Sequence, residues 1–266
     1  MTSRRTPTAL GAPSSAIGAA PSGATDNGVV RVATYNVHGF VGTDSVYDPE
    51  RTARVIEQAR ADIVALQEVD FGRGPRAESS AVQWLAARLG MRCYFTPTRD
   101  GKRGHFGNAV LSPHDLVLVA QGVLPRRRDE ARAVQWLRVA APAFELHLMN
   151  THLSVSVRDR GAQVQALLGA EWIVQAGTEL PLVVCGDFNA LPGSLVYRRL
   201  ARALQDCQRG KTRHPTWPSR LPLLRLDHIF VSPSVRVRGI ATLDEALARR
   251  ASDHLPLVAE LDLSSS

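Results

Sequence analysis

Short apolar runs that end in polar residues constrain the fold of this chain more than any other feature of its sequence. The run from Leu182 to Cys185 is the clearest, because Gly186 ends it and Asp187 and Asn189 follow two residues apart. An apolar run this short predicts a strand that is buried on both faces. If the backbone stays extended, alternation turns the Asp187 and Asn189 side chains to the same side. An Asx turn, in which both side chains satisfy only local backbone groups, explains the pair equally well.

Similar runs recur along the chain and alternate with segments of helical periodicity. Strands are predicted for residues 29–36, 62–66, 92–96, 107–111, 116–120, 132–140, 143–150, 181–185, 226–231, 235–241 and 256–262. Helices are predicted for residues 49–60, 79–89, 157–176 and 194–204. So many strands with so few helices predict an α/β fold, in which two stacked sheets carry helices on their outer faces.

The length and the composition set the limits of the predicted domain. A chain of 266 residues can bury one large core, and we expect a single domain over residues 29–263. Residues 1–28 are mainly Ser, Thr, Ala, Gly and Pro. They bury too little apolar surface to offset the entropy of ordering, so they predict a disordered tail. No obligate protein partner is indicated.

The location of the protein is predicted from its cysteines and from its N-terminal residues. The three cysteines, Cys93, Cys185 and Cys207, are widely spaced and form no Cys-x-x-Cys pair. They predict reduced thiols and no disulfide framework. Arg4 and Arg5 resemble the start of a signal peptide, but no continuous apolar segment follows them. No stretch is long enough to span a membrane. We therefore expect a cytoplasmic protein.

The charge of the chain favours an anionic partner. The formal net charge is +7 and the sequence pI is about 10.0, and Lys102 and Lys211 are the only lysines. Arginine pairs well with phosphate, so a nucleic acid or another phosphate-bearing partner is favoured. Abundant arginine beside abundant alanine is also what a particular genomic base composition produces. The charge is therefore supporting evidence only.

Six of the apolar runs are flanked by Asn, Asp, Glu or His, which are the residues of general acid–base chemistry and of hard metal sites. The flanking residues are Asn36, Glu68, His152, Asp187 with Asn189, Asp227, and Asp253 with His254. Any one of them can be explained as a cap or a turn. Six together predict that they converge on one site.

The segments that carry these residues resemble a known family. They are Tyr35-Asn36-Val37, Leu66-Gln67-Glu68-Val69, Asn150-Thr151-His152-Leu153, Gly186-Asp187-Phe188-Asn189, Leu226-Asp227-His228-Ile229-Phe230 and Ser252-Asp253-His254-Leu255-Pro256. In this order, from residue 30 to 262, they resemble the endonuclease/exonuclease/phosphatase superfamily of DNase I-like fold. The resemblance implies a four-layered α/β sandwich with two stacked, mainly antiparallel sheets and the site at one edge. It also implies a metal-dependent hydrolase of phosphoric esters.

The resemblance assigns a metal site to three of these residues. Glu68 corresponds to the family's metal ligand, with Asn36 and Asp253 close to it. Carboxylate and amide oxygens suit Mg²⁺ or Mn²⁺ and do not suit zinc.

The resemblance assigns the catalytic and phosphate-binding roles to six further residues. Asp187 positions or activates the attacking water, and Asn189 contacts the phosphate. His254 acts as a base or as a phosphate-binding cation, and Asp227 orients it. His152 binds the phosphate or protonates the leaving oxygen. Asn108 lies on a strand that approaches the site, where it either hydrogen-bonds His152 or only marks a strand end.

Other polar and aromatic residues have weaker claims to a role. Strand alternation turns His228 away from Asp227, which predicts a structural histidine. His38 and Asp70 fit loop structure as well as a site. Trp217, in a proline-flanked loop, is the only tryptophan that we would test for contact with substrate.

The sequence favours a phosphodiesterase that acts on nucleic acid. No hydrophobic membrane-docking hairpin is evident. The alternatives are a phosphoesterase for phospholipids or inositol phosphates, a phosphomonoesterase, and a non-catalytic binding module on the same scaffold.

Overall fold

The computed structural model describes residues 28–71, 80–101, 104–127, 129–177, 179–208 and 213–264, and the side chains of residues 99–101, 104 and 105 are not described. Apart from Gly28, the predicted disordered tail lies outside these residues. The first described strand begins at Val29 and the last ends at Asp262.

Two six-stranded sheets form the centre of the described chain. Sheet I has the strand order β11-β12-β1-β2-β4-β3, and sheet II has the order β5-β6-β7-β8-β10-β9. The strands of sheet I are β11 (Arg236–Thr242), β12 (Leu257–Asp262), β1 (Val29–Asn36), β2 (Ile63–Asp70), β4 (Gly104–Ser112) and β3 (Arg92–Gly101). The strands of sheet II are β5 (Asp115–Val123), β6 (Ala133–Ala141), β7 (Phe144–His152), β8 (Leu182–Asp187), β10 (Asp227–Val231) and β9 (Gln205–Asp206). In each sheet one neighbouring pair is parallel, β1 with β2 and β7 with β8, and the others are antiparallel.

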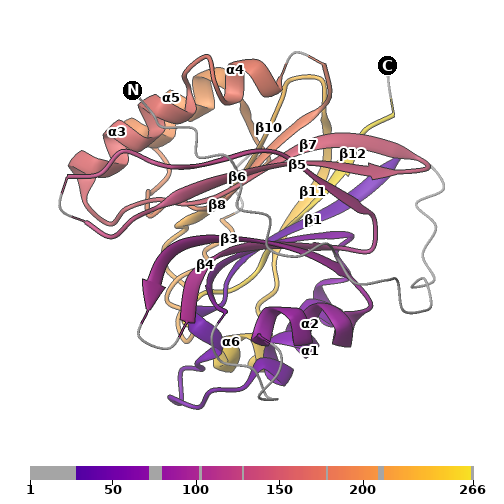
Figure 1. Ribbon diagram of the computed structural model, residues 1–266, viewed down its shortest axis with the longest axis vertical. Helices are drawn as coiled ribbons and strands as arrows, with labels where there is room; N and C mark the ends of the chain where they lie inside the picture. Colours follow the sequence, from indigo (N-terminus) through magenta and orange to yellow (C-terminus); the bar gives the residue numbers. More distant parts are fainter. Residues whose placement is uncertain are drawn as a thin grey trace.

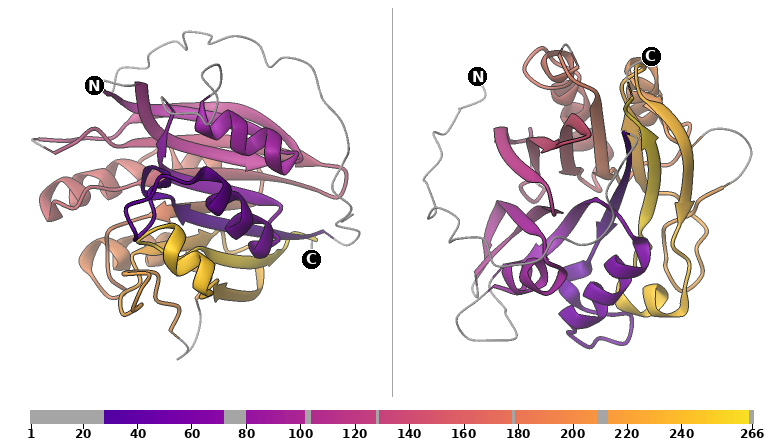
Figure 2. Two further views of the ribbon diagram at one scale, coloured as in Figure 1. Left: turned by 90° about the horizontal axis from the view of Figure 1, so that it is seen from below. Right: turned by 90° about the vertical axis from the view of Figure 1, so that its right-hand side faces the viewer.

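Helices cover the outer face of each sheet, which gives four layers (Figure 1). On the outer side of sheet I lie α1 (Pro49–Ala59), α2 (Ala81–Leu89) and α6 (Ala246–Ala251). On the outer side of sheet II lie α3 (Val157–Leu167), α4 (Ile173–Ala176) and α5 (Leu195–Ala203). The views in Figure 2 show the same layering from below and from the side. The predicted four-layered α/β sandwich is confirmed.

Three apolar cores fill the spaces between the layers. The central core lies between the sheets and includes Val32, Ile63, Leu148 and Val183, all with no exposed surface. The other two cores lie between each sheet and its own helices. Because β8 is covered on both faces, all of its residues are buried, as its apolar run predicts.

Local sequence signals fix the ends of the helices. Asp48 caps α1 by accepting a hydrogen bond from the Arg51 backbone N–H, and Pro49 occupies the first turn. A capping box starts α2: the Ser80 hydroxyl accepts from the Gln83 N–H, and the Gln83 side chain accepts from the Ser80 N–H. Gly90 then ends α2 in the left-handed conformation that glycine favours.

One helix prediction is wrong. The segment 157–176 is not one helix, because α3 ends at Leu167 and α4 begins at Ile173. The chain turns at Gly169, whose N–H donates to the Ala166 carbonyl. The sequence also missed three short elements: the 3-10 helix η1 (His38–Phe40), β9 and α6.

His228 is a core residue, in agreement with its predicted structural role. Its ring stacks on Phe230 and meets Phe188 edge-on, and its Nε2 lies 2.7 Å from the Ala190 carbonyl. Nε2 therefore carries the proton of a neutral ring and donates it, while Nδ1 is buried with no described partner. Burial lowers the pKa of His228 to about 3, because protonation would leave a second buried N–H unpaired.

This depressed pKa predicts an acid-sensitive fold. The buried neutral ring stabilises the protein above pH 6.5, and that stabilisation falls by roughly 1 kcal/mol per pH unit as the pH drops from 6.5 toward 3. We expect His228→Gln to be less stable than the wild type at pH 7 but to lose less stability between pH 7 and pH 5. Urea unfolding at both pH values measures this difference, and an equal loss in the two proteins would contradict it.

Candidate active site

The strand register brings three of the predicted side chains into one row at the edge of sheet II. His152 pairs with Asp187 across the parallel strands β7 and β8, and Asp187 pairs with Asp227 across the antiparallel strands β8 and β10. Asn36 is the last residue of β1 in sheet I, and this end of β1 faces the same edge. One hydrogen bond, from Asn36 Nδ2 to Asp187 Oδ2, joins the two sheets at this edge.

A β-bulge directs Glu68 into the site. The pairing of β2 with β4 shifts between Leu66 and Val69, so that Gln67 and Glu68 both lie opposite Asn108. Glu68 has a φ of 55°, which is uncommon for a residue other than glycine. Bulges of this kind re-aim a side chain. As a result Gln67 points into the core while its neighbour Glu68, about a quarter exposed, reaches the site.

The side-chain amide of Asn36 connects the two acidic groups. Its Nδ2 donates to Glu68 Oε1 at 3.0 Å and to Asp187 Oδ2 at 3.1 Å. Its Oδ1 accepts from the backbone N–H of His38 at 3.1 Å, which fixes the orientation of the amide. Asn36 therefore holds Glu68 and Asp187 together at the bottom of the site.

Asp187 is at once a turn residue and a site residue. Its Oδ1 accepts from the Asn189 N–H at 2.9 Å, which is the Asx turn. Its Oδ2 lies 3.4 Å from His152 Nε2 and 3.7 Å from His254 Nε2. Burial raises the pKa of Asp187, and the two histidines oppose that shift. A buried carboxylate of this kind is suited to accept a proton.

The backbone does not stay extended beyond Asp187, so of the two explanations of the Asp187 and Asn189 pair the turn is the one that the structure shows. Asn189 has a φ of 47°. Its side chain reaches the site by the turn, with Nδ2 3.0 Å from the Leu153 carbonyl and 3.2 Å from His152 Nε2. Gly186 directly precedes Asp187, and only glycine fits there, because an added Cβ would lie 1.8 Å from the Thr151 carbonyl oxygen.

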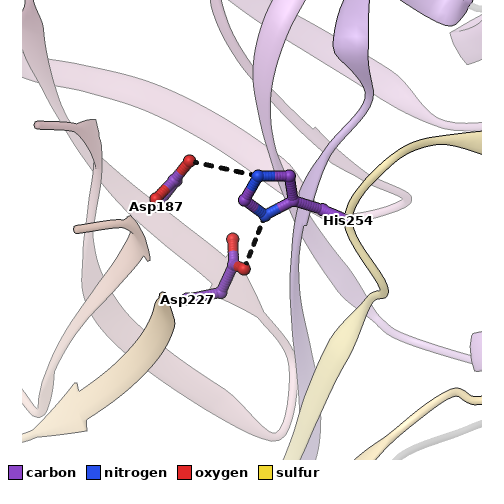
Figure 3. A group of neighbouring side chains, drawn as sticks. All are labelled: Asp187, Asp227 and His254. Atoms are coloured by element: carbon purple, nitrogen blue, oxygen red, sulfur yellow. Dashed lines mark hydrogen bonds and ion pairs between the residues drawn. The ribbon is translucent and has the colours of Figure 1, made fainter. Parts of the chain in front are cut away.

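His254 and Asp227 form a buried ion pair (Figure 3). His254 Nδ1 lies 2.8 Å from Asp227 Oδ2, and the other ring nitrogen points at Asp187. Burial alone would lower the pKa of His254, but the carboxylates of Asp227 and Asp187 raise it to about 10. His254 is therefore a cation at neutral pH. The second oxygen of Asp227 is buried and has no described partner.

His152 lies beside the same carboxylate in the opposite protonation state. It is buried, and Arg132 Nη1 lies 2.8 Å from its Nδ1 and 3.1 Å from its Nε2. Burial lowers the pKa of His152 to about 3, and the Arg132 charge adds to that effect against the attraction of Asp187. Asp187 thus stands between one neutral and one charged histidine.

Two of the predicted site residues lie differently from the others. Asp253 hydrogen-bonds Trp217 Nε1 at 3.4 Å and lies 4.0 Å from His38 Nδ1, and none of its described contacts reaches Glu68 or Asn36. Asn108 is buried under the bulge and donates to the Ala133 carbonyl at 3.3 Å. The suggested Asn108–His152 hydrogen bond is not among the described contacts.

The oxygen atoms around Glu68 fit a divalent cation better than the group formed by Asp187, Asp227 and His254 does. Asp187, Asp227 and His254 also place ligand atoms within 4.8 Å of one another. However, a protonated His254 has no lone pair to offer, and its Nδ1 is already bonded to Asp227. Glu68 is accessible, and no described residue hydrogen-bonds its Oε2. Carboxylate oxygens with an amide nearby are the donor set that Mg²⁺ prefers.

Sequence reasoning missed several residues that support the site. Arg132 packs against His152. Burial lowers the pKa of Arg160, and the nearby carboxylate of Asp187 opposes that shift. Gln67 and Asn150 join the sheets below the site, with Gln67 Nε2 2.9 Å from Asn150 Oδ1. Asn150 and Gln67 stand inside the motifs that carry the resemblance, which is the one signal that could have found them. No pattern distinguishes the two arginines from the many others.

The contacts of Asn150 predict a large contribution to stability. Its Nδ2 donates to the Leu66 and Ala109 carbonyls at 3.0 Å, and its Oδ1 accepts from Gln67. We expect Asn150→Ala to destabilise the protein by about 3 kcal/mol, because it takes the buried side-chain donor from the Leu66 and Ala109 carbonyls and removes the hydrogen bond that Gln67 makes across the gap between the sheets. Chemical unfolding measures the effect, with Gln165→Ala on the exposed face of α3 as the matched amide control. A loss no larger than that of the control would contradict this prediction.

None of the helices in the described ranges is long and apolar enough to cross a membrane.

Comparison with known proteins places this geometry in a family. The model of the Endonuclease/Exonuclease/phosphatase family matches residues 33–254. The uncharacterized protein YbhP of Escherichia coli (strain K12) is 29% identical over 246 residues, which cover 88% of this chain and 96% of YbhP. Nocturnin of Xenopus laevis is 26% identical over 257 residues, which cover 81% of this chain and 65% of nocturnin.

Solved structures agree with the family match. The human nocturnin catalytic domain with bound sulfate superposes with a TM-score of 0.68 at 25% identity, and the match covers 90% of this chain and 96% of that domain. A family protein from Bacteroides thetaiotaomicron has the same fold, with a TM-score of 0.71 at 21% identity over 88% of this chain and 97% of its own. The chain therefore belongs to the endonuclease/exonuclease/phosphatase family.

Proposed function

We propose that this protein is a divalent-metal-dependent phosphoesterase, and that phosphodiesters are its substrates. The observation that carries the proposal is the position of Asp187, a buried carboxylate whose Oδ2 lies within 3.7 Å of both His152 and His254. Hydrolysis of a phosphoester needs a water held in line with the scissile bond and charge stabilisation around the phosphorus. A carboxylate between two histidines can supply both.

Each residue of the site has a role in this proposal. Asp187 orients the attacking water and accepts its proton while the new P–O bond forms and the bond to the leaving oxygen breaks. His254, held as a cation by Asp227, stabilises the negative charge of the phosphoryl oxygens. His152 and Asn189 donate hydrogen bonds to the phosphate, and His152 lies on the side where a leaving oxygen can be met. Asn108 supports this side from beneath and contacts the phosphate only indirectly.

Glu68 and Asn36 would hold the metal ion, with Asp253 reaching it through water. When bound, the ion polarises a phosphoryl oxygen and stabilises the leaving group. Mg²⁺ and Mn²⁺ are the ions that this oxygen donor set suits.

The positive charge of the chain supports nucleic acid as the substrate class. A phospholipid head group is the second candidate, and the specific observation in its favour is a set of exposed aliphatic side chains beside the site. The three free cysteines support action in a reducing compartment such as the cytoplasm.

The catalytic roles predict large losses of activity in two variants. We expect hydrolysis of bis-p-nitrophenyl phosphate with Mg²⁺ or Mn²⁺ to fall at least about 10²-fold in Asp187→Ala and in His254→Ala, because each removes a group that acts in the transition state. Asp115→Asn, an exposed carboxylate at the start of β5, is the matched control and should keep full activity. Wild-type inactivity on every phosphoester would favour the binding module, and faster hydrolysis of p-nitrophenyl phosphate would favour a monoesterase.

The metal assignment predicts a separate change in metal affinity. Glu68→Gln should weaken Mn²⁺ binding, measured by isothermal titration calorimetry, by about tenfold or more, because a neutral amide replaces the charged ligand. Glu145→Gln, on the exposed surface of sheet II, should bind Mn²⁺ like the wild type. If His254→Asn abolishes binding while Glu68→Gln does not, the ion sits instead among Asp187, Asp227 and His254.

A further inference from the structure

Two arginines, Arg132 and Arg160, stand beside His152 and Asp187, and none of the roles proposed above uses them. Arg132 directly precedes β6, and its Nη1 lies 2.8 Å from His152 Nδ1. Arg160 lies in the first turns of α3, close enough to Asp187 for that carboxylate to act on its pKa. Both arginines are partly exposed. Two cations from different elements therefore border the same pair of site residues.

Backbone hydrogen bonds fix the position of Arg132. Its carbonyl accepts from the Leu124 N–H at 2.7 Å, and the carbonyl of the next residue, Ala133, accepts from the Thr151 hydroxyl at 3.0 Å. The shorter of its two contacts with His152 is to Nδ1, which accepts the hydrogen bond and leaves the ring proton on Nε2. Arg132 thus holds His152 through Nη1, and no described group accepts from its Nη2.

Arg160 is anchored by the chain that follows His152. Its Nη1 donates to the carbonyls of Ser154 at 2.9 Å and of Val155 at 3.1 Å. Its Nε is buried with no described partner, and so is the Nε of Arg132. No described group accepts from its Nη2 either. Each guanidinium is therefore held through one nitrogen and keeps Nη2 available for a ligand.

No described carboxylate forms an ion pair with either guanidinium. Asp129 lies near Arg132, but its Oδ1 accepts from the Glu130 N–H at 2.8 Å and its Oδ2 accepts from the Ser154 hydroxyl. The Ser154 hydroxyl is the main reason that the pKa of Asp129 is lowered, and the charge of Arg132 contributes less. The oxygens of Asp129 are thus engaged away from the two arginines.

Two other arginines that are withdrawn from solvent do have carboxylate partners. Arg225 Nη2 lies 2.6 Å from Asp206 Oδ2, and Arg51 Nη1 lies 3.0 Å from Asp44 Oδ1. A cation withdrawn from water without a counter-ion costs free energy, and an anion that binds beside it offsets that cost. Unpaired arginines beside a phosphoester site are therefore suited to a ligand that brings an anionic group of its own.

We propose that Arg132 and Arg160 bind a second phosphate of the substrate, next to the phosphoester that the site cleaves. Guanidinium groups suit this role because their planar N–H donors match the oxygens of a phosphate. Resting on the proposed function, this subsite makes the substrate a phosphoester that carries a neighbouring phosphate. A nucleic-acid strand and a nucleoside bisphosphate both have this chemistry, and a zwitterionic phospholipid head group does not.

A purely supporting role is the other explanation of these contacts, because Arg132 holds His152 and Arg160 holds the chain after it. Loss of such support weakens every ligand of the site alike. Loss of a phosphate subsite weakens only a ligand that has the second phosphate. The ratio of two affinities therefore separates the two explanations.

Calorimetric titration of two nucleotides tests the subsite. The full chain is titrated with thymidine 3′,5′-bisphosphate and with thymidine 5′-monophosphate, in EDTA so that no metal-dependent hydrolysis consumes them. We expect the bisphosphate to bind about tenfold or more tightly, because its second phosphate adds charge-assisted hydrogen bonds. In Arg132→Gln/Arg160→Gln the two nucleotides should bind with nearly equal affinity. The control, Arg158→Gln/Arg199→Gln, removes two exposed arginines that have no described ion pair and should keep the wild-type ratio.

Equal affinity of the wild type for the two nucleotides, or no binding of either, would overturn the subsite. So would an Arg132→Gln/Arg160→Gln variant that loses affinity for both nucleotides by the same factor, which is the result of a supporting role. Arg132→Lys/Arg160→Lys covers the case of a glutamine variant that does not fold, because it keeps both charges without the planar fork. It should have the wild-type circular dichroism spectrum and keep part of the preference for the bisphosphate.

A single-stranded oligothymidylate distinguishes the two sources of the second phosphate. Binding that is tighter than that of the bisphosphate, and that weakens in the glutamine variant, supports the subsite and assigns the phosphate to a nucleic-acid strand. Binding that is weaker than that of the bisphosphate supports a subsite for a small nucleotide.

Hydrolysis of bis-p-nitrophenyl phosphate, which has no second phosphate, separates this inference from the proposed function. Hydrolysis by a wild type that does not prefer the bisphosphate would overturn the subsite and leave the phosphoesterase intact. An arginine-dependent preference for the bisphosphate in a protein that cleaves no phosphoester would overturn the phosphoesterase and leave the subsite intact.

Discussion

The amide bridge between Gln67 and Asn150 is the interaction on which the site depends, because the residues of the candidate site come from two separate sheets. Apolar packing between sheets is not directional, so it cannot fix their relative position to the fraction of an ångström that catalysis requires. The bridge is directional: Gln67 Nε2 bonds Thr34 within sheet I and Asn150 across the gap, and Asn150 bonds two carbonyls of sheet I. A buried polar network whose donors and acceptors are nearly all paired favours one arrangement over nearby alternatives. The bridge also explains the bulge in β2, because Gln67 must point into the core while the next residue, Glu68, must point into the site.

At the edge of sheet II, two histidines beside the carboxylate of Asp187 are in opposite charge states. His254 has a buried partner in Asp227 and is held as a cation, whereas His152 has Arg132 against its ring and stays neutral. Burial affects both rings in the same direction, so the neighbouring charges decide the difference. This edge therefore presents a fixed cation on one side of Asp187 and a neutral ring on the other.

The sequence predicted the layers of the fold and grouped residues that the structure brings close together, but it did not predict how several of those residues reach their positions. Strand ends are visible in a sequence because apolar runs stop there, and this is why Asn36, His152 and Asp187 could be grouped. The bulge at Glu68 and the left-handed turn at Asn189 leave no such trace, because each depends on a neighbouring strand or loop. Asp253 shows the converse: its motif suggested a place near Glu68, while its described side-chain contacts are to Trp217, His38 and Ser252. Position along a motif fixes the neighbourhood of a side chain and does not fix its partner.

Net charge is a weaker guide to the ligand than the distribution of that charge. On the outer side of sheet I the arginines are neutralised locally, since Arg51 pairs with Asp44 and Asp48, and Arg88 pairs with Glu50 and Glu57. The formal charge of +7 therefore has its effect where exposed arginines lack such partners, as Arg158, Arg198 and Arg199 do among the described residues.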